Sequence, residues 1–198
     1  FKPGESDAAV IRLREQNEKN KNKVFSGVAA SVDCNSRWVY LDPFRGTVAA
    51  VAESARNVSC VGAEPIAITN NLNFSSPETE IGYWQLSSSC NGISEACKVL
   101  ETPVTGGNVS LYNESKNRNN EITPINPTPV IGMVGKIDNV KKAVSSEWKN
   151  MNDQIWLIGS CKSETTLAAS SYLEYFHGEI TGRPPKIDLL DEKFCQSF

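Results

Sequence analysis

Histidine is almost absent from this sequence, since His177 is the only one among 198 residues. A metal cage built from imidazoles needs several histidines, and so this chain cannot supply one. Histidine is also the most common general acid or base, but His177 has no Ser, Cys or Asp partner in its sequence context. We therefore expect His177 to lie on the surface, and we do not expect a self-contained catalyst that depends on histidine.

Long apolar runs and paired cysteines are missing as well. No stretch approaches the ~20 residues that span a membrane, and the first residues lack the apolar core of a signal peptide. The six cysteines form no CxxC pair, which excludes a zinc ribbon. We expect scattered reduced thiols in a cytoplasmic protein, with no membrane partner.

Neither sign of charge dominates the chain. Lys and Arg number 20, Asp and Glu 23, and the formal net charge of −3 argues against binding nucleic acid through a broad basic face. Small anions remain candidate ligands, because backbone N–H groups and a metal ion can hold them. The chain starts at Phe1 and stops within a charged amphipathic stretch, so we expect a piece of something larger.

The apolar pattern predicts an α+β fold with a mixed sheet and helices on one face. Alanine-rich and amphipathic periodicity predicts helices at residues 47–59 and 83–100. The pattern of residues along the sequence changes after about Gly159. This change predicts a first domain at 1–160 and, at 161–198, a linker with the truncated start of another domain. Polar loops are expected at 15–23 and 113–126. Strands are expected at 8–13, 24–32, 38–41, 65–72, 103–112, 129–137 and 153–159.

The segment with the densest chemistry is Thr-Pro-Val-Thr-Gly-Gly-Asn-Val-Ser-Leu-Tyr-Asn at 102–113. Gly106 and Gly107 inside a strand indicate a bulge or a close backbone approach, which is what a phosphate needs. Asn108 and Ser110 occupy alternate positions, so they share a strand face and could serve Mg²⁺ and a polar substrate group. The alternative is a structural glycine bulge with satisfied polar residues beside it. No lysine follows the glycines, so this is not a Walker loop.

Two other segments allow a functional and a structural interpretation. Three amides end an apolar strand, either to present a ligand or to close the strand with an Asx-turn; they are Asn70, Asn71 and Asn73. In the other segment, two aspartates could hold a metal and two arginines a phosphate, namely Asp33, Asp42, Arg37 and Arg45. For Asp42 we favour turn chemistry and an N-cap for the following helix.

Taken in order, these segments resemble the phosphoribosylformylglycinamidine synthase family, and within it the second domain of AIR-synthase N-terminal type. The resemblance covers nearly the whole chain. It is carried by Asp-Pro-Phe-Arg-Gly at 42–46, by Gly-Ala-Glu-Pro-Ile-Ala-Ile-Thr at 62–69 and by Leu-Asn-Phe at 72–74. The most specific string is Pro-Val-Thr-Gly-Gly-Asn-Val-Ser-Leu-Tyr-Asn at 103–113.

The resemblance implies an AIR-synthase-like domain whose sheet pairs with that of a homologous half, missing here, to close a barrel with ATP sites at the junction. It implies an ATP-dependent ligase of purine biosynthesis that turns formylglycinamide ribonucleotide into the amidine. It further implies that ammonia comes from glutamine through a glutaminase subunit or domain. ATP and Mg²⁺ are the implied cofactors.

Carried over one by one, the resemblance makes Asn70 and Gly107 ATP contacts, Asn108 a magnesium ligand and Ser110 a substrate contact. The position of Asn70 is commonly Asp in the family, so one charge is lost here. No catalytic residue is carried over, because the family's catalytic histidines lie in the other half. The chain alone is therefore expected to be inactive.

Two alternatives stay open. The domain could be a non-catalytic assembly module whose exposed sheet edge pairs with a homologous domain. It could also belong to a small-molecule kinase of the same superfamily, although the string Asn-Val-Ser-Leu-Tyr argues against this. Independently of these alternatives, an isolated fragment leaves bare the surface meant for the missing half, which predicts that it forms a homodimer.

Overall fold

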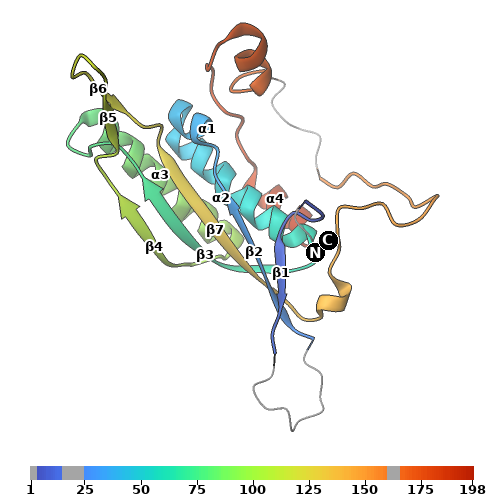
Figure 1. The fold of residues 1–198 in the computed structure, drawn as a ribbon. Coiled ribbons are helices and arrows are strands. Elements are labelled where there is room, and N and C mark those ends of the chain that lie inside the picture. Colours follow the sequence, from blue (N-terminus) through green and yellow to red (C-terminus); the bar gives the residue numbers. More distant parts are fainter. Residues whose placement is uncertain (1–3, 15–24, 160–165) are drawn as a thin grey trace.

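The computed structural model describes residues 4–14, 25–159 and 166–198, and a five-stranded sheet forms its centre (Figure 1). The strand order is β1-β2-β7-β3-β4. All neighbours pair antiparallel except β3 and β4, which are parallel. The expected α+β fold with a mixed, mostly antiparallel sheet is confirmed. The strands are β1 (Ala9–Arg12), β2 (Gly27–Asp33), β3 (Glu64–Asn73), β4 (Val104–Ser110) and β7 (Thr128–Ile137).

Two long helices, α2 (Pro43–Cys60) and α3 (Glu80–Leu100), cover one face of the sheet, as expected (Figure 1). The side chain of Asp42 caps α2 by accepting a hydrogen bond from the Arg45 N–H at 2.9 Å. Small and β-branched residues let α2 lie close to the strands, so that a single core forms between the layers. Its fully buried members include Val51, Ala55, Val58, Ile68, Ala96, Ile131 and Met133.

Two of the expected strands are wrong. Residues 38–41 belong to helix α1 (Ser36–Leu41), because Asn35 caps it at the Trp38 N–H and the next helix starts directly after it. Residues 153–159 form no strand, and Trp156 is 78% exposed. A strand needs a hydrogen-bonding neighbour, and this segment pairs with no other strand in the described ranges.

The expected polar loop at 113–126 contains a short hairpin of β5 (Glu114–Lys116) and β6 (Ile122–Pro124). A 3₁₀ turn, η1 (Val140–Lys142), follows β7. The loop expected at 15–23 and the domain boundary expected at 160 lie outside the described residues. No helix of the described ranges is both long and apolar enough to cross a membrane.

The last described segment, 166–198, lies against the helical layer rather than apart from it. It contains a π-helical turn, η2 (Leu173–His177), and helix α4 (Leu189–Gln196), which packs on α2 and α3. Arg56 on α2 pairs with Glu192 on α4 at 2.8 Å. The indole N–H of Trp38 donates to the Ala169 carbonyl at 2.8 Å. His177 is exposed, as expected.

Candidate functional site

The sheet face opposite the two long helices is exposed and has two chemically distinct halves. Toward β1 and β2 it carries apolar side chains, such as Ile11 at 67% and Val32 at 72% exposure. Toward β3 and β4 it carries hydroxyl and amide groups, among them Thr69, Asn71 and Asn108. We call this surface the open face.

The parallel pairing of β3 and β4 brings all four predicted site residues into four consecutive positions. Asn70 lies opposite Gly107, and Asn73 lies opposite Ser110. Between them, Asn71 lies opposite Asn108. A register shift after Ile68 leaves one extra residue on β4 just before the glycines, which is the predicted bulge. The three asparagines of β3 lie within the strand, so the Asx-turn alternative is wrong.

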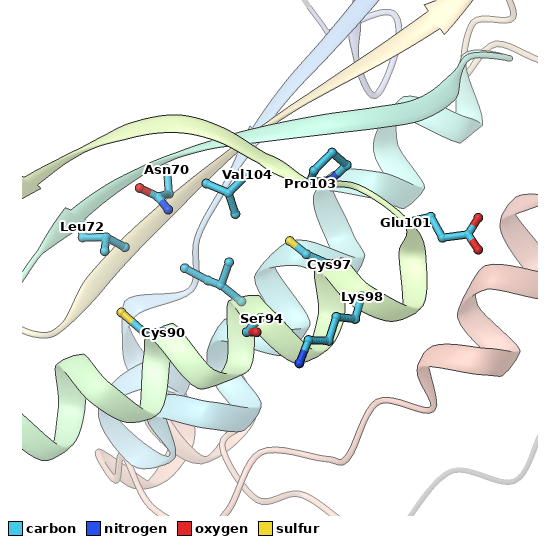
Figure 2. Close-up of a pocket in the computed structure, with 10 residues that line it drawn as sticks. Asn70, Leu72, Cys90, Ser94, Cys97, Lys98, Glu101, Pro103 and Val104 are labelled. Atoms are coloured by element: carbon cyan, nitrogen blue, oxygen red, sulfur yellow. The ribbon is translucent and has the colours of Figure 1, made fainter.

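The same pairing divides the four residues between the two faces of the sheet, because successive strand residues alternate. Asn70 points to the helix side, where it lines a cavity of about 570 Å³ between the strands and α3 (Figure 2). Gly107 shares that side, since a Cβ added there would lie only 2.6 Å from the Asn70 carbonyl oxygen. Asn108 belongs to the open face, where its amide donates to the Asn71 side-chain oxygen at 3.1 Å.

The cavity beside Asn70 is mainly apolar. Cys90 and Cys97, which are seven residues apart on α3 and so share a helix face, both line it, with Lys98 at its edge (Figure 2). Burial raises the pKa of both thiols, so they are protonated and weakly nucleophilic at neutral pH. The cavity therefore offers packing space, the Asn70 amide and the polar groups of Ser94, Lys98 and Glu101, but no reactive thiol.

Ser110 takes part in a turn that the sequence did not reveal. Its hydroxyl donates to the Asn113 side-chain oxygen at 3.2 Å, and the Asn113 amide donates back to the Ser110 carbonyl at 2.8 Å. The Asn113 amide also reaches the Phe74 carbonyl at 3.1 Å. Tyr112 adopts the left-handed conformation with φ 59°. An asparagine just after a strand is the one signal that could have indicated this turn. The Ser110 oxygen still has lone pairs to accept from a ligand.

The side chains around Asn108 offer oxygen ligands for magnesium but no negative charge. Mg²⁺ prefers oxygen ligands, and Asn108, Asn71 and Ser110 offer only neutral ones. No group of three or more His, Cys, Asp or Glu side chains in the described residues could hold a metal ion. Asn108 offers one neutral oxygen ligand, and the described residues do not complete a magnesium site around it.

The aspartates and arginines considered as a second site serve structural roles. The N-cap role of Asp42 is confirmed, and its other oxygen pairs with Arg183 at 2.6 Å. Each of the other three also contacts a residue distant in sequence. Arg37 pairs with Glu174, Arg45 donates to the Pro184 carbonyl, and Asp33 accepts from Asn57.

The fold defines an α+β domain in which two long helices cover one face of a mixed sheet. Comparison with known proteins shows the family to which this domain belongs. The chain belongs to the family described as AIR synthase related protein, N-terminal domain, whose model matches residues 5–137. The phosphoribosylformylglycinamidine synthase subunit PurL of Prochlorococcus marinus (strain MIT 9312) is 93% identical over all 198 residues. These residues make up 25% of that relative, so the chain spans about a quarter of the length of the curated relatives it matches.

Solved structures of T. maritima PurL are similar over most of the chain. The complex with ATP has 35% identity and a TM-score of 0.59, covering 71% of this chain and 21% of that one. The complex with FGAR has 33% identity and a TM-score of 0.56, with the same coverage. This similarity supports both the fold and the resemblance described from the sequence.

Proposed function

We propose that the chain forms one domain of an ATP-dependent ligase that converts formylglycinamide ribonucleotide to formylglycinamidine ribonucleotide. The observation that carries this proposal is the pairing of β3 with β4, which sets Asn70 and Gly107 on the helix side directly beside Asn108 and Ser110 on the open face. The similarity to PurL structures holding ATP and FGAR supports the same conclusion.

In this proposal ATP phosphorylates the formamide oxygen of the substrate, and ammonia then displaces that phosphate, leaving ADP and inorganic phosphate. Asn70 and Gly107 contact the nucleotide, and Ser110 accepts a hydrogen bond from the substrate. Asn108 contributes an amide oxygen to magnesium, which neutralises phosphate charge when bound. The chain therefore supplies positioning and hydrogen bonds rather than a catalytic residue of its own.

The proposed function also concerns the parts of the enzyme that surround this domain. We propose that the apolar half of the open face packs against the sheet of a homologous domain in a barrel, and that residues 161–198 begin the following domain. Ammonia would come from a glutaminase subunit or domain. We place the reaction in the cytoplasm, because the five cysteines described are all free thiols.

The test uses a full-length subunit that carries this segment, with Asn108→Ala as the variant. We expect the magnesium concentration needed for half-maximal turnover to rise on the order of 10–100-fold, as is typical when groups that hold a metal are removed. Asn91→Ala is the matched control, because Asn91 is exposed on α3, away from the open face. Binding of Mn²⁺ in the presence of ATP, followed by electron paramagnetic resonance, gives a readout independent of turnover.

The assembly module remains the second candidate, and specific observations favour it. Gly107 is required by the sheet itself, the Ser110 hydroxyl is held in a turn, and the amides bring no carboxylate. If Asn108→Ala left both the magnesium requirement and Mn²⁺ binding unchanged, the module would be the better description.

A further inference from the structure

Asn113 lies between the end of β4 and the start of β5, and its side-chain amide makes three hydrogen bonds. The nitrogen donates to the Ser110 carbonyl at 2.8 Å and to the Phe74 carbonyl at 3.1 Å. The oxygen accepts from the Ser110 hydroxyl at 3.2 Å. Because a carbonyl can only accept, the two carbonyls fix which way the amide is turned. The Asn113 oxygen therefore faces Ser110, and the Ser110 hydroxyl has to be the donor in their bond.

The two carbonyls do not depend on the Asn113 side chain for a partner. The Ser110 carbonyl also accepts from the Phe74 N–H at 3.0 Å, and the Phe74 carbonyl also accepts from the Asn113 N–H at 3.1 Å. Both carbonyls would keep a backbone partner if the side chain were removed, so neither would be left unsatisfied. The contact that the backbone does not duplicate is the one between Asn113 and the Ser110 hydroxyl.

The residue just before Asn113 has a strained backbone. Tyr112 has φ 59°, a left-handed conformation that bulky residues seldom adopt. Its hydroxyl donates to the Glu78 carboxylate at 3.1 Å, which ties this turn to the segment before α3. Backbone strain of this kind is concentrated where a fold holds a functional group in a set geometry. In this turn the group that is held is the Ser110 hydroxyl.

We propose that Asn113 is a positioning residue, which holds the Ser110 hydroxyl so that it can only accept a hydrogen bond from the substrate. This inference rests on the proposed function, in which Ser110 contacts the ribonucleotide. A serine hydroxyl has one hydrogen and two lone pairs, and it rotates when no neighbour holds it. With its hydrogen directed at Asn113, the oxygen presents lone pairs to an N–H or O–H group of the substrate. Fixing the hydroxyl before binding also lowers the entropy lost when the substrate binds.

The experiment is a double-mutant cycle in a full-length subunit carrying this segment. We expect Ser110→Ala to raise the KM for formylglycinamide ribonucleotide about tenfold and Asn113→Ala to raise it about fivefold, as for loss or weakening of one hydrogen bond. The KM for ATP should stay at its wild-type value. The double variant should match Ser110→Ala, because Asn113 acts only through that hydroxyl. Asn119→Ala is the matched control, because Asn119 is exposed in the turn between β5 and β6.

Melting temperatures give a readout that does not need turnover. Without ligand, Asn113→Ala should melt within a few degrees of the wild type, because both carbonyls keep their backbone partners. The rise in melting temperature on adding the ribonucleotide should be smaller for Asn113→Ala than for the wild type and for Asn119→Ala.

Each other outcome overturns the inference in a recognisable way. A further fivefold rise in KM in the double variant would show that Asn113 acts independently of Ser110. A wild-type KM for Asn113→Ala, or a variant that no longer folds, would make Asn113 a structural residue only. These results would leave the proposed function intact. A wild-type KM for Ser110→Ala would remove the contact on which the inference rests, and absence of turnover in the wild-type subunit would reject the proposed function itself.

Discussion

The thiol of Cys34 illustrates how neighbouring groups set the chemistry of one residue. Burial, together with the negative charges of Glu53 and Asp33, raises its pKa to about 11. Only the thiolate reacts with alkylating reagents, so a pKa about two units above the ordinary value lowers the reactive fraction about 100-fold. We predict that at pH 8 iodoacetamide labels Cys34 about 100-fold more slowly in the folded chain than in urea, as measured by peptide mass spectrometry.

A variant separates charge from burial. Glu53→Gln removes one negative neighbour, which lowers the Cys34 pKa, increases the thiolate fraction at pH 8 and should speed labelling. Glu95→Gln on α3 serves as the control, because Glu95 is not among the groups that shift the Cys34 pKa. Equal labelling rates in the folded and unfolded chain would contradict the prediction.

At the scale of elements, Asp42 connects the start of α2 to the last segment of the chain. One carboxylate oxygen caps the helix and the other pairs with Arg183. We predict that Asp42→Ala lowers the free energy of unfolding by about 1–2 kcal/mol, mainly through loss of the cap. Urea denaturation of the 198-residue chain, followed by circular dichroism, measures this change.

The matched variant is Asp42→Asn, which keeps a side-chain oxygen for the cap but loses the charge facing Arg183. Because Arg183 is largely exposed, its pair with Asp42 is screened by water and contributes little. Asp42→Asn should therefore be clearly more stable than Asp42→Ala. Equal losses for the two variants would mean that the cap is not the main contribution.

The elements that were predicted correctly are specified by their own residues, whereas those that were missed depend on residues outside them. Helix α3 and strand β7 were predictable because the spacing of apolar residues within each segment indicates its secondary structure. The segment at 38–41 was misread as a strand because its helix depends on Asn35 and Asp42 at its two ends. The segment at 153–159 has strand-forming residues, but among the described residues it has no strand to pair with.

The site shows the same division. That Asn108 and Ser110 share a face followed from their spacing along one strand. The position of Asn70 on the other side of the sheet could not be predicted in this way, because it depends on how β3 and β4 are aligned. The register shift before Gly106 sets this alignment; the two glycines indicate the bulge, but they do not specify which residue of β3 lies opposite each of them.

At the scale of the whole molecule, the open face presents exposed apolar side chains on a regular sheet surface. Ile11 and Val32 contribute exposed apolar side chains to it. Burying such a surface releases ordered water and is favourable, so a sheet exposed in this way tends to find a partner. We predict that the isolated 198-residue chain forms a homodimer through this face. Size-exclusion chromatography with light scattering over a range of concentrations should show twice the chain mass.

Val32→Lys tests whether the open face is the contact. Ser31 faces α2, with its hydroxyl donating to the Ser54 carbonyl, so the neighbouring Val32 points away from the core. A lysine there places a charge at the centre of the proposed contact, and the chain should become monomeric with an unchanged melting temperature. Ile81→Lys is the control, because Ile81 is equally exposed at 69% but lies on α3. A Val32→Lys chain that stayed dimeric, or an Ile81→Lys chain that became monomeric, would move the contact away from the open face.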